Sequence, residues 1–391
     1  MKKRLVATMM SLAMTLALLA GCTAGGDSAG GNATSAAQQD GSGETAAPAQ
    51  GSGQSAYGNV TANGEYSFVV IVKSMSSDFW RAAVQGAEDE AEVLGVKVNC
   101  QGPSSNTDIA DQVQMLNNAI NSAPDGIALA ASDADAVMDA LQAAKDAGIP
   151  VVCFNSGVPG APDGSVLATA KTDNYNAGAI AAENMYEALK DQIAAASSDA
   201  QVRIGLVNQD VTSDSVVNRG LGFIDKMCEL IRADGKTVGV TGSDKYVDDA
   251  KDAGDAATAD VIIEVRVPAQ ATSELCATEA SALLNEEDLI GIMGTNQETA
   301  EGIVTADENL GKLGNGVIGA GFDSGATVVG AVESGKLFGA VTQSPRFQGQ
   351  IAVDLLTMIA NGETVQDEET PAFWYNADNM NDPEIAPNLI R

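Results

Sequence analysis

The run Ser67-Phe-Val-Val-Ile-Val72 and the stretch 78–94 that follows it decide the fold class of this chain. The run is apolar and largely β-branched, which predicts a strand covered on both faces. The stretch from Asp78 to Leu94 predicts a helix, with Asp78 as its cap and Gly95 as its stop. A doubly buried strand followed directly by a helix is typical of parallel sheets with helical crossovers.

The same alternation continues to the end of the chain. In the first half it predicts strands at Val96–Cys100, Gly126–Ala130, Pro150–Phe154 and Val166–Ala170, and helices at Ile109–Asn121 and Ala134–Ala147. In the second half it predicts strands at Arg203–Val207, Val261–Val265, Leu289–Gly294, Val317–Gly321 and Phe338–Thr342, and helices from about Asn174, Ser215, Thr272, Glu298 and Arg346. The pattern predicts an α/β fold of two doubly wound, Rossmann-like lobes with parallel sheets and right-handed crossovers.

The N-terminus carries an export signal. Basic residues at 2–4 precede an apolar segment, Leu5 to Leu19, that is shorter than the roughly 20 residues of a membrane-spanning helix. Leu19-Ala20-Gly21-Cys22 resembles the bacterial lipobox. The interpretation is a signal peptide at 1–21 and lipidation of Cys22, which would anchor the protein to a membrane on its extracytoplasmic face, at the cell surface or in the periplasm. An ordinary secretory peptide with an unrelated cysteine is the alternative.

A linker follows Cys22. Residues 22–64 are mainly Gly, Ser, Ala, Thr, Gln and Asn, and almost none of them is large and apolar. Such a segment buries too little surface to offset the entropy of ordering it, so we expect a flexible tether. Random-coil scaling gives it a reach of about 35 Å.

Charge and composition exclude several classes of function. The formal net charge of −32 would repel phosphate backbones and anionic lipids, so we expect no nucleic-acid partner. Histidine is absent, which removes the commonest general base and metal ligand. We therefore predict no enzymatic activity, no cofactor and no metal.

Four cysteines lie beyond Cys22, at positions 100, 153, 228 and 276. None forms a CxxC pair, and Cys153 lies inside an apolar strand, so buried free thiols are expected. One disulfide remains open in an exported protein, and the spacing does not select its partners.

Polar or aromatic residues follow most of the predicted strands, where ligands of parallel sheets bind. These residues are Phe79, Trp80, Asn155, Ser156, the segment Asp210 to Arg219, Asn296, Asp323 and Gln343. Amides and charged groups with two hydrogen-bonding atoms match vicinal hydroxyls, and an aromatic face packs on the apolar side of a sugar ring. Each residue taken alone could equally cap a helix or form a turn, but together they indicate a sugar site.

The chain from about Tyr66 onward resembles the ribose-type periplasmic binding proteins, the solute-binding subunits of sugar ABC importers. The matching segments are Asp78-Phe79-Trp80, Pro150-Val-Val-Cys-Phe-Asn155, Thr172-Asp173-Asn174, Arg219-Gly-Leu-Gly-Phe223, Gly294-Thr-Asn296, Gly319-Ala-Gly-Phe-Asp323 and Gly339-Ala-Val-Thr-Gln343. No single segment is specific to this family, but the order and spacing of the seven segments are.

The resemblance implies a binding site. Phe79 and Trp80 would sandwich the sugar, and its hydroxyls would bond to Arg219, Asn296, Asp323 and Gln343. Asn155 and Ser156 stand where ribose binders carry an Asp-Arg pair, and Gln270 stands where an aromatic closes the ring stack. These departures argue against ribose itself.

Three of these residues have other interpretations. Trp80 could belong to the core, and Arg219 could pair with Asp214 or Glu183 at the surface. Asp323 could cap the next helix. Asp173 and Asn174 fit a hinge or a helix cap rather than ligand contacts.

The resemblance also implies the function and architecture. We expect a monomer that captures a neutral monosaccharide, a pentose or hexose, between two lobes and delivers it to the permease subunits of an ABC importer. The expected lobes are 65–172 with 344–372, and 173–343 with 373–391. Three crossings near 171–173, 342–345 and 371–374 would form the hinge.

Other functions stay open. The same body could bind a nucleoside or a furanose signalling molecule, or it could serve a chemoreceptor or sensor kinase. An extracellular hydrolase is the alternative from a different class. It is disfavoured because histidine is absent and the strand ends offer no close carboxylate pair.

Overall fold

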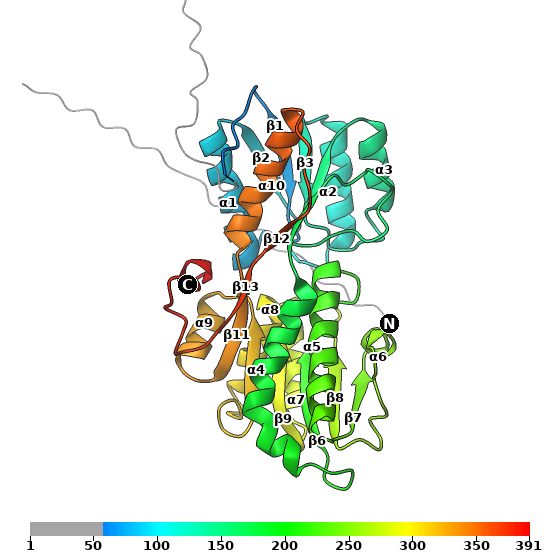
Figure 1. Ribbon diagram of the computed structural model, residues 1–391, viewed down its shortest axis with the longest axis vertical. Coiled ribbons are helices and arrows are strands. Elements are labelled where there is room, and N and C mark those ends of the chain that lie inside the picture. The colour runs from blue at the N-terminus through cyan, green and yellow to red at the C-terminus, as the bar shows by residue number, and fades with distance from the viewer. Residues whose placement is uncertain (1–57) are drawn as a thin grey trace, which may run out of the picture. The chain divides into compact units, whose positions relative to one another are not determined.

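The computed structural model describes residues 58–391 (Figure 1). The predicted signal peptide, Cys22 and most of the predicted linker lie outside the described residues. The described chain folds into two sheets with helices packed on them, so the predicted α/β class is confirmed.

The first lobe is built on a six-stranded sheet in the order β12-β5-β4-β3-β1-β2. All of its strand pairs are parallel. Its strands are β1 (Ser67–Ile71), β2 (Lys97–Gln101), β3 (Gly126–Leu129), β4 (Val151–Phe154), β5 (Thr169–Thr172) and β12 (Glu368–Thr370). Its helices are α1 (Asp78–Leu94), α2 (Ile109–Asn121), α3 (Met138–Asp146) and α10 (Pro345–Ala360).

Helices cover both faces of this sheet, as the apolar run of β1 requires. Phe68 and Val70 pack with α1 and α10, whereas Val69 and Ile71 pack with α2 and α3. Alternate residues of a strand point to opposite faces, so a strand covered on both faces must be apolar throughout.

The second lobe has a seven-stranded sheet in the order β13-β11-β10-β9-β6-β8-β7. Its strands are β6 (Val202–Val207), β7 (Val238–Gly242), β8 (Val261–Arg266), β9 (Leu289–Gly294), β10 (Ile318–Phe322), β11 (Leu337–Gln343) and β13 (Ala372–Tyr375). Its helices are α4 (Asn174–Ala195), α5 (Asp214–Ala233), α6 (Asp244–Asp249), α7 (Ser273–Leu284), α8 (Gln297–Asp307) and α9 (Ala326–Glu333), with a 3₁₀ turn at Ala386–Asn388. Only β13 runs antiparallel to its neighbour among the pairs of this sheet.

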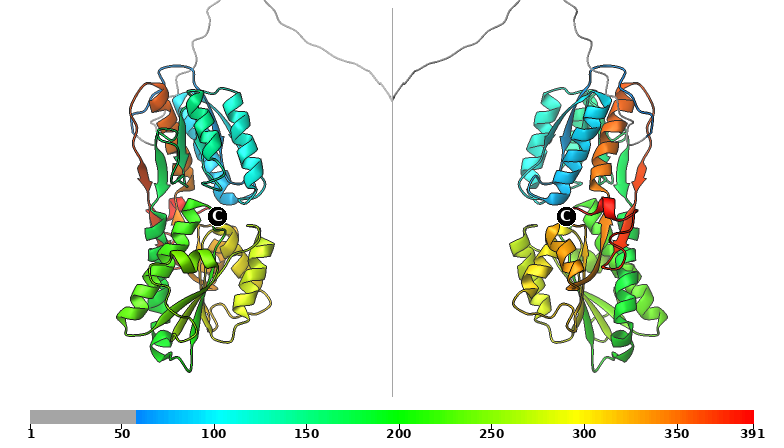
Figure 2. Two further views of the ribbon diagram at one scale, coloured as in Figure 1. Left: turned by 90° about the vertical axis from the view of Figure 1, so that its right-hand side faces the viewer. Right: turned by 90° about the vertical axis from the view of Figure 1, so that its left-hand side faces the viewer.

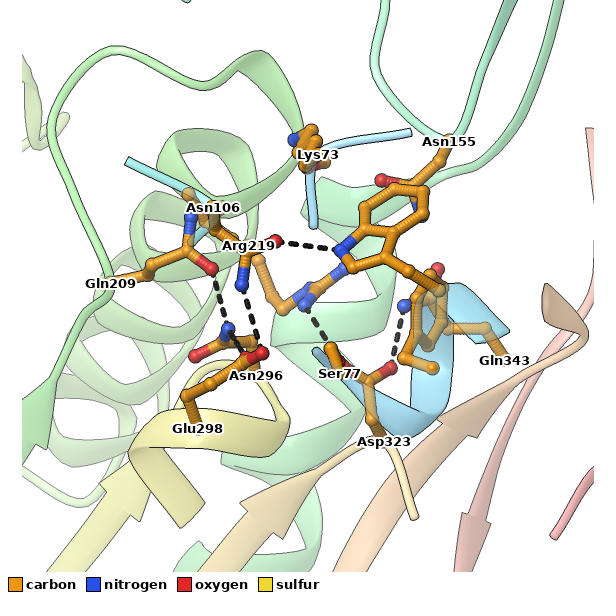
Figure 3. A pocket seen from close by; sticks show the side chains of 14 residues that line it. Lys73, Ser77, Asn106, Asn155, Gln209, Arg219, Asn296, Glu298, Asp323 and Gln343 are labelled. Carbon is orange, nitrogen blue, oxygen red and sulfur yellow. Dashed lines mark hydrogen bonds and ion pairs between the residues drawn. The ribbon is translucent and has the colours of Figure 1, made fainter. Parts of the chain in front are cut away.

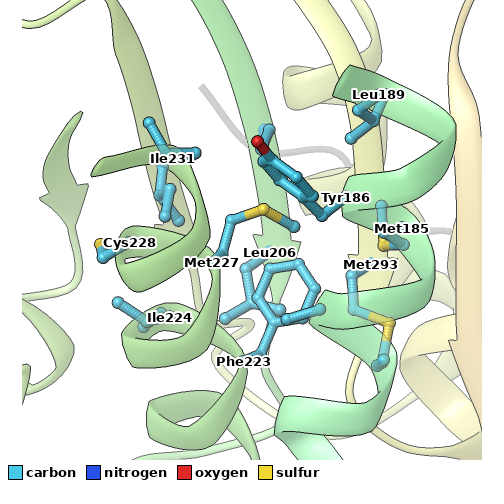
Figure 4. Close-up of a cluster of buried hydrophobic side chains, with 14 of the residues drawn as sticks. Met185, Tyr186, Leu189, Leu206, Phe223, Ile224, Met227, Cys228, Ile231 and Met293 are labelled. Atoms are coloured by element: carbon cyan, nitrogen blue, oxygen red, sulfur yellow. The ribbon is translucent and has the colours of Figure 1, made fainter. Parts of the chain in front are cut away.

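The core of the second lobe also lies on both faces of its sheet. Figure 4 shows the cluster under α4 and α5, where Met185 and Phe223 meet Leu206 and Met293 of the strands. A second cluster packs α7, α8 and α9 against the opposite face.

The chain passes between the two sheets three times. It leaves the first sheet after β5 to form α4, returns after β11 to form α10, and leaves again between β12 and β13 (Figures 1 and 2). The connections are only a residue or two long, because β5 ends at Thr172 and α4 begins at Asn174, and β11 ends at Gln343 and α10 begins at Pro345.

Each lobe contains a closely packed helix pair that relies on glycine. In the first lobe, a Cβ at Gly86 of α1 would lie 2.0 Å from the Arg346 carbonyl oxygen of α10, and a Cβ at Gly349 would lie 2.0 Å from the Ala83 carbonyl oxygen. In the second lobe, Gly178 of α4 and Gly222 of α5 make equally close approaches. Any larger residue would push these helices apart.

Most predicted elements are present, with differences in the short ones. The bounds of α2 and β9 match their predictions, but β5 begins at Thr169 rather than Val166. The helix predicted from Ala134 begins at Met138, because Asp133 accepts a hydrogen bond from the Ala136 amide and holds a turn there. β7, β12, β13, α6 and α9 were not predicted from the sequence.

The packed part of the chain begins before residue 65. Val60 and Ala62 pack against the first lobe, and Asn361 bonds to the Asn63 amide at 3.0 Å and to the Thr61 carbonyl at 2.8 Å. The linker is therefore several residues shorter than its composition indicated.

The expectation of free thiols is confirmed for the described cysteines. Cys153, Cys228 and Cys276 are buried, Cys100 is half-buried, and none is in a disulfide. Burial raises the pKa of each of these thiols to about 12. Over residues 58–391 we find no helix long and apolar enough to cross a membrane.

Candidate ligand-binding cleft

A polar cavity lies between the two lobes, where the carboxyl ends of both sheets face each other (Figure 3). Its volume is about 20 Å³. Seven of the nine predicted site residues line it: Phe79, Trp80, Asn155, Arg219, Asn296, Asp323 and Gln343. Ser215 and Val216 also line it and belong to the predicted segment from Asp210 to Arg219. The remaining lining residues were not predicted as site residues: Lys73, Ser77, Asn106, Gln209 and Glu298.

Asn155 and Asp323 occupy equivalent places in the two lobes. Each directly follows a strand, β4 or β10, and each has a left-handed backbone, with φ of 62° and 67°. Asn and Asp are the non-glycine residues that best tolerate this conformation, which is concentrated at functional sites. The backbone turn therefore aims one amide and one carboxylate into the cavity from opposite sides.

Arg219 and Asp323 form the charged centre of the second-lobe wall. The Arg219 Nη1 lies 4.0 Å from Asp323 Oδ2, and Gln343 Nε2 donates to Asp323 Oδ1 at 2.7 Å. Arg219 also donates to the Thr295 carbonyl at 2.6 Å and to Asn174 Oδ1 at 2.8 Å. Burial lowers the pKa of Arg219 to about 10 and raises that of Asp323, although each charge opposes the shift of the other.

These contacts decide two of the open interpretations. Arg219 is buried, so its predicted alternative pairing at the surface is wrong; Asp214 pairs with Lys171 and Glu183 pairs with Lys226 instead. Asp323 does not cap α9, whose N-cap residue is Gly325.

Asn296 lines the cavity and caps a helix as well. Its Oδ1 accepts from the Thr299 amide at the start of α8, and its Nδ2 donates to Gln209 Oε1 at 2.5 Å. The hydrogen bond to the start of α8 therefore holds the Asn296 side chain in place, and Asn296 in turn orients the Gln209 side chain.

The aromatic residues at the start of α1 pack against each other, so they do not sandwich a sugar ring between them as expected. The rings of Phe79 and Trp80 meet edge to face at 4.9 Å with an angle of 81°, and Trp80 also meets Phe154 at 6.3 Å. Both rings are buried in the core cluster of the first lobe and also line the cavity. The core interpretation of Trp80 and its place at the site are therefore compatible.

Lys73 is the main residue that sequence reasoning missed. It follows β1 and is buried, and its ammonium donates to the hydroxyls of Ser156 at 2.6 Å, Ser215 at 3.1 Å and Ser213. Burial lowers the pKa of Lys73 to about 8. The available signal was its place directly after Val72, at the end of the doubly buried strand.

Glu298 contributes a second missed charge. Its carboxylate accepts from Asn106 Nδ2 at 2.8 Å and from Asn296 Nδ2 at 2.5 Å, and Asn106 Oδ1 accepts from the Trp80 indole at 2.6 Å. Burial, with smaller effects of Asp323 and Glu301, raises the pKa of Glu298 to about 7.

Many of these hydrogen bonds join the two lobes. Lys73 and Asn106 come from the first lobe, whereas Ser213, Ser215 and Glu298 come from the second. Gln297 Oε1 likewise accepts from the Phe79 amide at 3.0 Å. The lobes are therefore in direct contact around the cavity.

Two predicted site residues do not line the cavity. Ser156 is buried beside it and accepts from Lys73 while donating to Ser215 at 2.8 Å. Gln270 is exposed in the loop between β8 and α7. Asp173, expected to be a cap, caps α4 by accepting from the Asn176 amide.

The geometry defines a class of protein. Two doubly wound lobes joined by three short crossings, with convergent amides and charges between their carboxyl ends, are typical of the two-lobed solute-binding proteins of type I. The chain belongs to the periplasmic binding protein family, whose sequence model, described as "Periplasmic binding protein domain", matches residues 68–364.

Individual relatives agree with this assignment. The "Ribose import binding protein RbsB" of Bacillus subtilis is 23% identical over 302 residues, which cover 77% of this chain and 84% of the relative. A solved structure from Brachyspira murdochii, titled "ABC transporter, LacI family transcriptional regulator", is 33% identical with a TM-score of 0.68, covering 84% of this chain and all of the other. An ABC transporter solute-binding protein from Agrobacterium vitis, solved with D-fucose, is 27% identical with a TM-score of 0.69, covering 83% of this chain and all of the other.

The family consists of extracytoplasmic proteins that bind solutes for transporters. The chain is accordingly a binding protein of the ABC transporter type and not an enzyme, as its composition indicated.

Proposed function

We propose that this protein is an extracytoplasmic lipoprotein that captures a neutral monosaccharide, a pentose or hexose, and delivers it to an ABC importer. The sugar binds in the cavity between the lobes. Relatives whose names or structures specify ribose and D-fucose support a sugar as the solute.

The state of Arg219 is the observation that carries the proposal. This guanidinium is buried in the wall of the cavity, and its Nε atom has no hydrogen-bond partner. A buried, unpaired donor costs about 1–3 kcal/mol, so a ligand oxygen that accepts from it gains that energy. Because Asp323, Asn296 and Gln343 adjoin it, the ligand must offer several hydroxyls at close spacing.

The other cavity residues have complementary roles. Phe79 and Trp80 pack on the apolar side of the sugar ring, and Asn155 donates or accepts from the opposite lobe. Lys73 replaces the arginine that the resemblance places at position 156, with Ser156 as its support.

Binding closes the two lobes about a hinge. The lobes comprise 65–172 with 344–372 and 173–343 with 373–391, and the three short crossings act as the hinge. A cavity of about 20 Å³ is far below the roughly 300 Å³ of typical ligand pockets, so a sugar enters only when the lobes separate. The permease subunits then recognise the closed form.

The lipidated Cys22 and the linker are the last part of the proposal. Lipid on Cys22 holds the monomeric protein at the membrane, and the polar linker lets it reach the transporter.

A panel of sugars tests the proposal directly. Thermal unfolding of the purified protein is measured with D-ribose, D-allose, D-fucose, other pentoses and hexoses, and nucleosides. A ligand at one hundred times its Kd adds about 2.7 kcal/mol, which raises Tm by a few degrees. A shift with a monosaccharide supports the proposal, whereas shifts with nucleosides alone, or with nothing, contradict it.

A further inference from the structure

A second chamber adjoins the cavity at the edge of the cleft. It has a volume of about 360 Å³, within the usual range of ligand pockets, and residues of both lobes line it. Ser77, Asn106 and Glu298 line both this outer chamber and the inner cavity, so the two spaces share a wall.

The shared wall consists of hydrogen-bonded side chains. Trp80 donates to Asn106 at 2.6 Å, and Asn106 donates to Glu298 at 2.8 Å. Asn106 and Glu298 come from different lobes, so this bond breaks whenever the lobes separate. A ligand bound during closure can pass through the wall if it takes over these hydrogen bonds.

The lining of the outer chamber indicates what it binds. Six serines contribute hydroxyl groups: Ser74, Ser76, Ser77, Ser104, Ser105 and Ser273. Three carboxylates, Asp78, Glu298 and Glu301, outnumber the single cation Arg81, which pairs with Asp78. Hydroxyls and acceptors suit a neutral, polyhydroxylated group, whereas an anion would be repelled and an apolar group would find little surface.

The loop before α7 explains why this space is open. Ala271, Thr272 and Ser273 line the chamber, and the Ala271 amide bonds to Thr107 of the other lobe at 3.2 Å. Gln270, expected at the sugar ring, is exposed, and the residues 267–273 include no aromatic side chain. The small side chains of this loop thus leave the chamber open, whereas an aromatic side chain in the loop would fill it.

We propose that the outer chamber is a second sugar subsite, so that, besides the monosaccharide of the proposed function, the protein binds a disaccharide or another glycoside with one unit in each space. The proposal rests on the proposed function, because it assumes that the inner cavity binds a sugar unit. Glu298 and Asn106 then contact the ligand near its glycosidic bond, and the serines and Glu301 bond to the outer unit.

Calorimetric titration of the purified protein tests the subsite. The probes are D-glucose, D-galactose and D-xylose, their methyl glycosides, and cellobiose, lactose, melibiose and xylobiose. We expect at least one disaccharide to bind tenfold or more tightly than either of its component sugars.

A variant that fills the outer chamber localises the effect. Ser273→Trp should reduce the preference for the disaccharide to less than threefold while the Kd of the monosaccharide stays unchanged. Thr278→Trp is the matched control, because Thr278 is exposed on the same helix and does not line the chamber. Equal Tm values of the variants confirm that both fold.

The outcomes separate the two proposals. Binding of monosaccharides with no gain for any disaccharide overturns the subsite and leaves the proposed function intact. An equal effect of Ser273→Trp on both kinds of ligand also overturns it. Failure of every sugar to bind contradicts the proposed function itself.

Discussion

The two walls of the inner cavity are organised differently. On the second-lobe wall, Arg219, Asp323, Asn296 and Gln343 bond mainly to groups of their own lobe, such as the Thr295 carbonyl and Gln209. On the first-lobe wall, Lys73 and Asn106 bond across the cleft to serines and to Glu298. These four second-lobe residues are pre-organised, whereas the bonds of Lys73 and Asn106 to the other lobe form only on closure.

This difference implies two contributions to sugar binding: affinity of the open form and stability of the closed form. A pre-organised wall needs no further ordering when a ligand arrives, so it gives affinity to the open form. A wall whose partners lie in the other lobe gives its contribution only when the lobes meet. We therefore expect the second-lobe residues to determine whether the sugar binds and the first-lobe residues to determine how stably the cleft stays closed.

The largest effect should come from Arg219→Ala, which breaks the pre-organised wall. We expect at least a hundredfold loss of affinity for the sugar that gives the largest thermal shift, because the fork of donors is lost and Asp323 keeps a buried, unpaired charge. Arg219→Lys should keep less than a tenth of the wild-type affinity for this sugar. Calorimetric titration measures both.

Arg203→Ala is the matched control for this prediction. Arg203 is also ion-paired in the second lobe, with Glu264 and Asp288, but does not line the cavity. Sugar affinity within threefold of the wild type is expected for Arg203→Ala, and the same result for Arg219→Ala would contradict the proposed site.

An intermediate effect is expected for Lys73→Met, which removes the bonds that cross the cleft. The loss of charged hydrogen bonds to both lobes should weaken sugar binding about tenfold, or roughly 1.4 kcal/mol.

Lys171→Met is the control, because Lys171 also pairs across the cleft, with Asp214, but its side chain is 38% exposed. Such a pair contributes little, so less than a threefold change is expected. Equal losses in the two variants would remove the distinction between the walls.

The smallest effect is a change in the pH dependence of stability. The pKa of Glu298 is raised from 4.5 to about 7, so its contribution to stability is fully present below pH 4.5 and is lost as the pH rises to about 7. Glu298→Gln should remove this loss, on the order of 1–3 kcal/mol. Urea unfolding of both proteins at pH 4.5, 6 and 7.5 measures it, and parallel stability profiles would contradict it.

Lys73 changes the stability in the opposite sense, because its contribution to stability grows as the pH rises. Its pKa is lowered from 10.5 to about 8, so its contribution is present above pH 10.5 and is lost as the pH falls through about 8. The comparison of Glu298→Gln with the wild type is therefore made below pH 8, and the values at pH 4.5 and 6, where Lys73 is charged, carry the most weight.

The sequence predicted the parts of the fold that carry strong local patterns. The long apolar strand β1 and the amphipathic helix α2 are examples, because burial on one or two faces determines their residues. The edge strand β7 was missed because Val238-Gly-Val-Thr-Gly242 is short and glycine-rich. A Cβ at Gly239 would lie 2.2 Å from the Ala256 amide nitrogen, a contact between distant segments that local patterns do not reveal.

The predicted site was most complete where residues follow strands directly. Asn155, Asp323 and Gln343 were found in this way, and the structure places them around the cavity. Glu298 and Asn106 lie in a helix and a loop, and only the meeting of the two lobes brings them together. Gln270 was predicted only from the family resemblance, and it is exposed in the loop between β8 and α7.

The two tryptophans of this chain lie in very different surroundings. Trp80 borders the cavity, with the Lys73 ammonium 6.0 Å from its ring, whereas Trp374 packs on Phe338 along β13. Any separation of the lobes breaks the Asn106–Glu298 link behind the Trp80 indole and admits water to it, which shifts its fluorescence to longer wavelength. Trp374 keeps its neighbour within the second lobe and serves as a constant background. The protein thus carries a built-in optical reporter of cleft closure that needs no label.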